Sequence, residues 1–306
     1  MTLAALLPII LIIATGYTIT RAGLISTDHW HGIERLAYYL LFPALLFKSV
    51  GTVDFDKLPA LSMGIALLLT ILSLIGFTIA LRPLLERKWG ISGPRFTSIF
   101  QGTARWNGFL ALAIANNLMG LDGVALLAVA MAVMIPVLNT ASIVVLSRYG
   151  QAARPSPVKI LRDLATNPFN VAIIAGLAVN FLGLPVPSAL MATLNMVGQA
   201  ALPVGIICIG AGLDLSSLRR PGPALTLGSF MRPIISPALG YGFAALLGLD
   251  GQAHVAVIIA CCVPTAANAY ILAKLMGGDA KLMAEIITLQ TLTAMVTMPV
   301  TLLLLA

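Results

Sequence analysis

Residues 97–118 read TSIFQGTARWNGFLALAIANNL, an apolar segment interrupted near its middle by polar residues. A helix needs about 20 mostly apolar residues to cross the hydrocarbon core of a bilayer. The interruption, residues 101–108, contains Arg105 and two glycines. Backbone released by such a break is tolerated in a membrane only where protein or a water-filled cavity satisfies it. This stretch predicts a membrane protein with an internal polar site.

The composition of the whole chain supports a membrane protein. Of its 306 residues 59% are hydrophobic and 9% are charged, and the mean hydropathy is +1.00. A soluble domain carries about 25% charged residues and could not bury this much apolar surface. The net charge of +7 does not predict a nucleic-acid partner, because most Lys and Arg residues lie in short gaps between apolar runs.

Ten apolar runs are long enough to span a bilayer. Their approximate limits are residues 3–20, 36–53, 58–82, 97–118, 124–147, 167–184, 189–213, 223–247, 254–275 and 284–305. The gaps after odd-numbered spans hold most of the 18 Lys and Arg residues, whereas the opposite side holds only Lys48, near the end of the second span, and Lys57. Because Lys and Arg in short loops stay in the cytoplasm, both termini are expected outside.

A set of punctuating residues recurs at a nearly constant shift between the first and second halves of the chain. At a shift of 160 residues the pairs Pro8 and Pro168, Gly16 and Gly176, and Gly23 and Gly183 coincide; at 157, Gly120 and Asp122 meet Gly277 and Asp279. Gly and Pro are abundant, with 27 and 18 residues, but these matches keep their order and spacing. Five spans per half predict two inverted repeats, as in many secondary transporters. We expect the first repeat over 1–150, a cytoplasmic linker over 151–166 and the second repeat over 167–306.

The fourth and ninth spans are interrupted at equivalent positions, since Asn107 coincides with Pro264 at the shift of 157. Pro264 blocks a regular helix, and the helical segment after each break offers N–H groups and a positive dipole end to an anion. Arg105 adds a permanent charge and a planar fork that suits a carboxylate. The predicted substrate-binding residues are Arg105, Asn107, Gly108, Pro264, Thr265 and Asn268.

Each of these polar residues also has a structural interpretation. Arg105 could extend to a membrane surface or pair with a carboxylate of a neighbouring helix, although a depth of roughly 13 Å opposes the first. Asn107 and Asn268 could join helices through hydrogen bonds.

A second set of polar residues is assigned to a transport pathway or ion site, with helix packing as the alternative. It comprises Gln101, Asn139, Arg232 and Gln290. Arg232 could instead reach the cytoplasmic headgroups. His29 and His31 flank Trp30 and are interpreted as interfacial rather than metal-binding. Cys208, Cys261 and Cys262 lie inside apolar segments, where a thiol acts as a small hydrophobic group, so no ligand role is predicted for them.

The chain resembles a bacterial member of the auxin efflux carrier family, whose plant relatives are the PIN auxin exporters. The resemblance covers the whole chain and is most specific at 105–108 (RWNG), 264–270 (PTAANAY) and 277–279 (GGD). It implies the fold of the bile-acid sodium symporters, with crossed, broken helices in the fourth and ninth spans and an elevator-type motion. The first, second, sixth and seventh spans would form a scaffold and dimer contact, and the other six a moving core.

The resemblance also implies substrates that are organic anions, including auxin in plants and dicarboxylates such as malate or malonate in bacteria. Asn107 and Gly108 replace a proline of the plant pattern, and the linker is short, which speaks against auxin itself. The expected function is a homodimeric, secondary active or facilitative transporter of mono- or dicarboxylates in the lipid of the cytoplasmic membrane, with no cofactor. The alternatives are an anion channel and an integral membrane protein with a role other than transport.

The sequence contains no H-E-x-x-H, no G-x-S-x-G, no intramembrane carboxylate pair and no P-loop motif G-x-x-x-x-G-K-[ST], so no enzymatic activity and no ATP-driven pumping are expected. No Asp or Glu lies deep in a span as an obvious proton relay, since Glu285 sits near a helix start. Proton coupling, sodium coupling and uniport stay open, as does the direction of transport.

Overall fold

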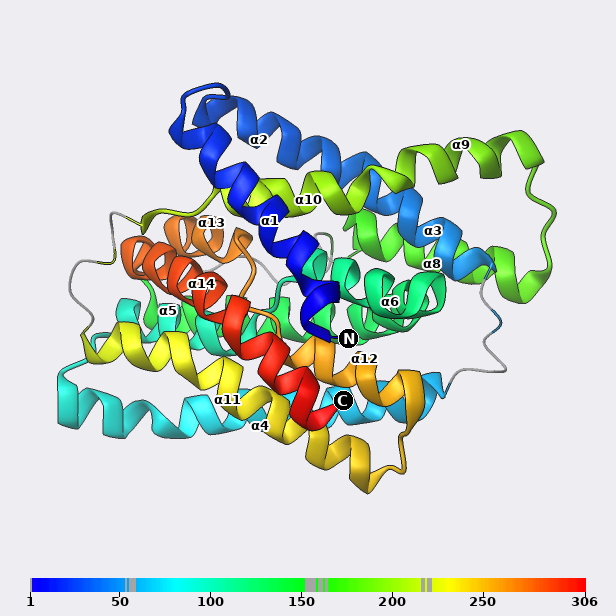
Figure 1. Cartoon of the computed structure of the whole chain (residues 1–306). Coiled ribbons are helices and arrows are strands. Elements are labelled where there is room, and N and C mark those ends of the chain that lie inside the picture. Colours follow the sequence, from blue (N-terminus) through cyan, green and yellow to red (C-terminus); the bar gives the residue numbers. More distant parts are fainter. Residues whose placement is uncertain are drawn as a thin grey trace. The chain divides into compact units, whose positions relative to one another are not determined.

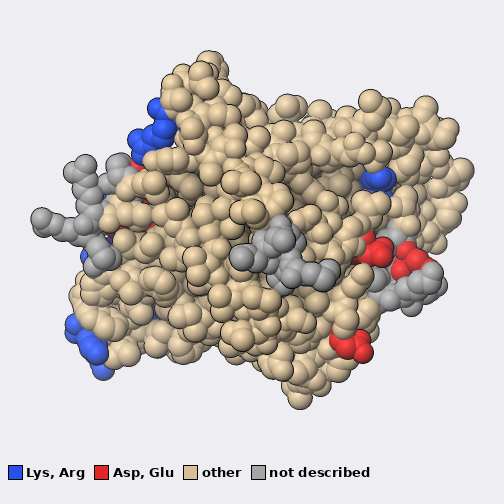
Figure 2. All heavy atoms as spheres, in the orientation of Figure 1, with Lys and Arg blue, Asp and Glu red and all other residues tan. Residues whose placement is uncertain are grey.

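The computed structural model describes residues 2–52, 54, 59–151, 158, 162, 165–215, 218 and 222–306. Within these residues every regular element is a helix (Figure 1). Among the described residues, four helical stretches are long and apolar enough to cross a membrane: Ala60–Trp89, Gly93–Tyr149, Ser188–Ala211 and Ala280–Leu305. Charged side chains occupy only small areas of the face drawn in Figure 2. The all-helical membrane class is confirmed, whereas ten spans in two inverted repeats stay a prediction.

The expected linker, 151–166, lies mostly outside the described residues. The helices before it follow the apolar runs. They are α1 (Thr2–Arg21), α2 (Thr27–Leu36), the π-helical turn η1 (Ala37–Leu41), α3 (Phe42–Thr52), α4 (Ala60–Trp89), α5 (Gly93–Ala104) and α6 (Gly108–Tyr149). Helix α2 occupies a stretch expected to be a loop. Trp30, Ile33 and Ala37 recur at helical spacing and are buried or half-buried, so an amphipathic face stabilises this helix.

The helices after the linker also begin and end near the limits of the apolar runs. They are α8 (Pro168–Leu182), α9 (Ser188–Gln199), α10 (Ala201–Ala211), α11 (Pro223–Leu246), α12 (Gly251–Cys262), α13 (Asn268–Leu275) and α14 (Ala280–Leu305). Side-chain caps define two of the helix starts: the Asn167 side chain accepts from the N–H groups of Phe169 and Asn170 at α8, and Asp279 accepts from Leu282 N–H at α14.

The chain divides into two compact units. The first unit comprises Met1–Ala60, Gly108–Ala132 and Leu161–Leu213, and the second unit comprises Leu61–Asn107, Val133–Ile160 and Asp214–Ala306. The helices of the first, second, sixth and seventh runs all fall in the first unit. Residues 108–132 fall there as well, although the family resemblance assigns them to the moving core. Helix α6 therefore contributes to both units, and Gly120, whose φ of 65° and ψ of −147° are not helical and suit glycine, divides it into two helical segments.

Glycines allow close helix packing in the first unit. A methyl group on Gly210 of α10 would lie 1.9 Å from the main-chain oxygen of Ile13 in α1, and one on Gly16 would lie 2.1 Å from that of Ile207. Small residues permit this approach of two backbones, which favours helix association inside a membrane. Helices α1 and α10 are therefore packed backbone to backbone.

Aromatic and polar contacts join other helices of the first unit. The rings of Phe42 and Phe109 are stacked, with centroids 4.1 Å apart, and Phe169 lies 5.9 Å from both. The Phe109 contact explains why the start of α6 groups with this unit. Lys48 of α3 donates a hydrogen bond to the side-chain oxygen of Asn195 in α9.

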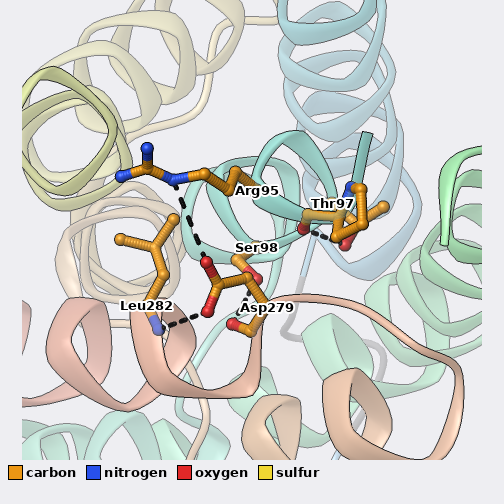
Figure 3. A network of polar contacts seen from close by, with 6 residues as sticks. Arg95, Thr97, Ser98, Asp279 and Leu282 are labelled. Atoms are coloured by element: carbon orange, nitrogen blue, oxygen red, sulfur yellow. Dashed lines mark hydrogen bonds and ion pairs between the residues drawn. The ribbon is translucent and has the colours of Figure 1, made fainter. Parts of the chain in front are cut away.

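Asp279 joins the starts of α5 and α14 in the second unit (Figure 3). Its carboxylate caps α14 at Leu282 N–H, at 3.0 Å, and lies 3.9 Å from Arg95 Nε. Its main-chain oxygen accepts from Ser98 Oγ at 2.8 Å, and its N–H donates to Pro94 O at 3.2 Å. The carboxyl residue of the Gly-Gly-Asp motif therefore anchors two helix ends to each other.

Candidate functional site

The two expected helix breaks are present, and they touch. Helix α5 ends at Ala104 before α6 begins at Gly108, and α12 ends at Cys262 before α13 begins at Asn268. The Asn107 N–H donates to the main-chain oxygen of Pro264 at 2.8 Å. Both residues are buried. Main chain from one break therefore satisfies main chain from the other, within the second unit.

Arg105 lies at the first break and reaches the second. It follows the last residue of α5 in an extended conformation, and its Nη2 donates to the side-chain oxygen of Asn268 at 2.9 Å. The Arg105 residue is only 8% exposed, which argues against extension to a membrane surface. Asn268 is exposed and is the first residue of α13. A buried cation and an exposed amide thus adjoin where the breaks meet.

The start of α13 offers fewer N–H groups to an anion than expected. The N–H groups of Ala269 and Tyr270 bond to the main-chain oxygens of Ala266 and Ala267, both at 3.1 Å. A tight first turn therefore consumes donors that an ordinary helix start leaves unpaired. The positive charge at this place comes mainly from Arg105.

Thr265 is committed to internal hydrogen bonds. Its residue is fully buried, its Oγ1 donates to Gln101 O at 3.1 Å, and its N–H donates to Gln290 Oε1 at 2.8 Å. Gln290 of α14 also donates from Nε2 to the main-chain oxygens of Gly102, at 2.8 Å, and Gly228, at 2.6 Å. Gln290 therefore ties the second break to α5 and α11.

Arg232 of α11 binds the C-terminal ends of α5 and α12, the helices that precede the two breaks. Its Nε donates to Val263 O at 2.7 Å and its Nη2 to Ala260 O at 3.1 Å, both at the end of α12. Its Nη1 donates to Ala104 O at 3.0 Å and Thr103 O at 3.3 Å, at the end of α5. The residue is 1% exposed and so does not extend to headgroups. A cation here is stabilised by the negative dipole ends of two helices.

The remaining predicted residues are placed differently. Gln101 is fully buried in α5, and neither atom of its side-chain amide has a hydrogen-bond partner in the described part of the chain. Asn139 is half-buried in α6. Gly108 is half-buried and is the residue at which the first unit resumes. Among the described residues, no group of three or more His, Cys, Asp or Glu could hold a metal ion.

Sequence reasoning placed Arg232 and Gln290 with pathway residues and did not identify what they bind. Their partners are main-chain carbonyls and an N–H group, which carry no residue-type signature. The available signal was indirect: an unpaired Arg and a Gln within apolar runs must find partners inside the protein.

Comparisons with known proteins agree with a membrane transport role. The model of a family described as membrane transport protein matches residues 1–153 and 139–302. An uncharacterized transporter of Methanothermobacter thermautotrophicus is 24% identical over 96% of this chain and 95% of that protein. A candidate malonate transporter of Rhizobium meliloti is 23% identical over 95% of this chain and 92% of its own length. The chain therefore belongs to the membrane transport protein family, which confirms its resemblance to the auxin efflux carriers.

Proposed function

We propose that this protein transports small organic anions, mono- or dicarboxylates, across the cytoplasmic membrane. The observation that carries the proposal is the position of Arg105, a buried guanidinium at the meeting point of two interrupted helices. A guanidinium presents a fork of donors that matches a carboxylate. The similarity to a candidate malonate transporter supports a dicarboxylate as one substrate.

The Arg105 site can exchange its partner. Asn268 offers Arg105 a neutral amide oxygen at 2.9 Å, and Asn268 itself is exposed. A carboxylate brings a full negative charge and can accept from two guanidinium donors at once, whereas the Asn268 oxygen is neutral and accepts from one. A substrate carboxylate would therefore displace the Asn268 oxygen from Arg105 and leave the Asn268 amide free to bind the other end of the substrate.

The proposed architecture is ten transmembrane helices in two inverted five-helix halves, working as an elevator. Internal sequence matches support the repeat, and the division into two compact units supports movement of the second unit against the first. Hydrogen bonds from Arg232 and Gln290 join α5, α11, α12 and α14 within the second unit. These bonds favour movement of that unit as one body. A homodimer through the first unit completes the proposal.

Counterflow in proteoliposomes tests the function. Proteoliposomes that contain the purified protein would be loaded with unlabelled malonate. Entry of labelled malonate, malate and acetate would then be compared for wild type, Arg105→Ala and Asn107→Ala. Arg105→Ala removes the charged donor, and loss of a hydrogen bond to a charged group corresponds to about a 10-fold to 100-fold loss of affinity for the carboxylate. Arg148→Ala, which removes an exposed cation at the end of α6, is the matched control for charge.

Saturable exchange that is lost in Arg105→Ala and kept in Arg148→Ala supports the carrier. Full carboxylate exchange by Arg105→Ala, or a preference for neutral or cationic solutes, would refute the anion site. Flux that does not saturate and shows no counterflow would identify the channel alternative.

A further inference from the structure

Four main-chain oxygens from two helix ends converge on one side chain, Arg232. They belong to Thr103 and Ala104 at the end of α5 and to Ala260 and Val263 at the end of α12, at donor to acceptor distances of 2.7 to 3.3 Å. The last carbonyls of a helix lack partners within the helix and carry its negative dipole end. Two such ends facing each other form a strong site for a cation.

Carbonyl sets of this kind have a known use in secondary transporters. Where transmembrane helices are interrupted near the midplane, the unwound carbonyls and the C-terminal ends of half-helices coordinate the coupling Na⁺ or H⁺. Here the guanidinium of Arg232 lies among such carbonyls, and three of its nitrogens donate to them. The residue is 1% exposed, so the charge is enclosed by protein.

We infer that Arg232 is a built-in cation that takes the place of a coupling ion at the carbonyls of Thr103, Ala104, Ala260 and Val263. This inference rests on the proposed transport function. A covalently attached cation neutralises the two helix ends in every step of a transport cycle. Carboxylate transport by the wild-type protein therefore proceeds without Na⁺, and removal of the side chain exposes a latent site for a free cation.

Thermal unfolding in detergent tests the latent site without any transport measurement. The probes are guanidinium and Na⁺ at millimolar concentrations, with choline as the reference cation. A ligand that binds only the folded state raises the melting temperature. We expect guanidinium to raise the melting temperature of Arg232→Ala by about 2 °C or more, and to leave wild type unchanged.

Arg82→Ala is the matched control variant. The Arg82 guanidinium is also largely enclosed, but its contacts are two aromatic faces and a carboxylate: it lies 4.2 Å from the centre of the Tyr149 ring, 5.3 Å from that of Phe96 and 3.5 Å from Glu86. Removing it opens a space without a carbonyl set. No guanidinium-specific stabilisation is expected for this variant, and a shift equal to that of Arg232→Ala would overturn the assignment.

A second pair of variants keeps the inference testable if Arg232→Ala does not fold. Arg232→Lys retains a charge at the helix ends, whereas Arg232→Met has similar length and no charge. The Lys variant is expected to melt at the higher temperature. Equal melting temperatures would show that the carbonyls do not require a cation and would overturn the inference.

Transport gives the final distinction. Wild-type carboxylate exchange should be equal in Na⁺ and in choline, and Arg232→Ala should be inactive in choline and regain exchange with guanidinium or Na⁺. A requirement of the wild type for Na⁺, or full activity of Arg232→Ala in choline, would overturn the inference. Absence of carboxylate exchange by the wild type in every salt would refute the proposed function alone, because the melting experiments still report on the cation site.

Discussion

Gln290→Leu should destabilise the protein strongly, because Leu cannot replace the hydrogen bonds at the second break. The substitution leaves the Thr265 N–H and the Gly102 carbonyl facing an apolar side chain. The Gly228 carbonyl also loses Gln290, but it lies inside α11, where a helical N–H serves as its partner. Each buried polar group without a partner costs about 1–3 kcal/mol. The two groups together lower the free energy of unfolding by about 2–6 kcal/mol, and the melting temperature by about 5–20 °C.

The assay is the melting temperature in detergent, followed by intrinsic fluorescence. Thr291→Val is the matched control, because Thr291 is the next residue of α14 and, within the described part of the chain, its hydroxyl donates only to Ile287 O of the same helix, at 2.8 Å. That loss should cost less than about 1 kcal/mol. If Gln290→Leu melts within about 2 °C of Thr291→Val, Gln290 does not hold the break in place.

Three further substitutions, at two positions, test the packing and the capping described above. Gly210→Ala places a methyl group 1.9 Å from the Ile13 main-chain oxygen, so α1 and α10 must separate at a cost of about 3 kcal/mol; a wild-type melting temperature for this variant would contradict the packing. Asp279→Ala should cost about 1–2 kcal/mol through loss of the cap at Leu282. Asp279→Asn should lose less than about 1 kcal/mol, since it keeps a capping oxygen and gives up only a pair at 3.9 Å with a half-exposed Arg95. Equal melting temperatures for the Ala and Asn variants would show that the cap is unimportant.

The interruptions of the fourth and ninth runs were predictable from local chemistry. Pro264 cannot continue a helix, and the polar run around Arg105 and Asn107 is too costly for an uninterrupted lipid-facing segment. The structure places the breaks at 105–107 and 263–267. The apolar runs likewise predicted most helix limits, because each run must satisfy its backbone within itself when it enters a membrane.

The contacts of Arg232 and Gln290 were not predictable in the same way. Gln290 bonds to Gly102 and Gly228, which are 188 and 62 residues away in the sequence. A Gln that caps carbonyls and a Gln that lines a pathway look identical in one sequence, because the difference lies in which helices pack beside it. The same limit applies to 108–132, whose grouping with the first unit depends on contacts such as that of Phe109 with Phe42.

Helix α2 was missed for a different reason. A search for continuous apolar runs cannot find an amphipathic helix that keeps Trp30 buried while His31 and Arg35 are exposed. Its apolar residues recur at helical spacing, so a search for that period would have identified it.

The arginine in α11 also constrains how the chain is made. α11 falls outside the four helical stretches that are apolar enough to cross a membrane, and an arginine near the centre of a helix adds about 2.5–3.5 kcal/mol to the free energy of insertion by the translocon. Two of its partners, Thr103 and Ala104, have been synthesised long before it emerges, and the other two, Ala260 and Val263, follow directly after it. In the proposed ten-helix architecture, integration of α11 during biosynthesis would draw on a first half that is already in the bilayer and on the prompt arrival of α12. A single buried side chain would then link the insertion of the late helices to that of the early ones.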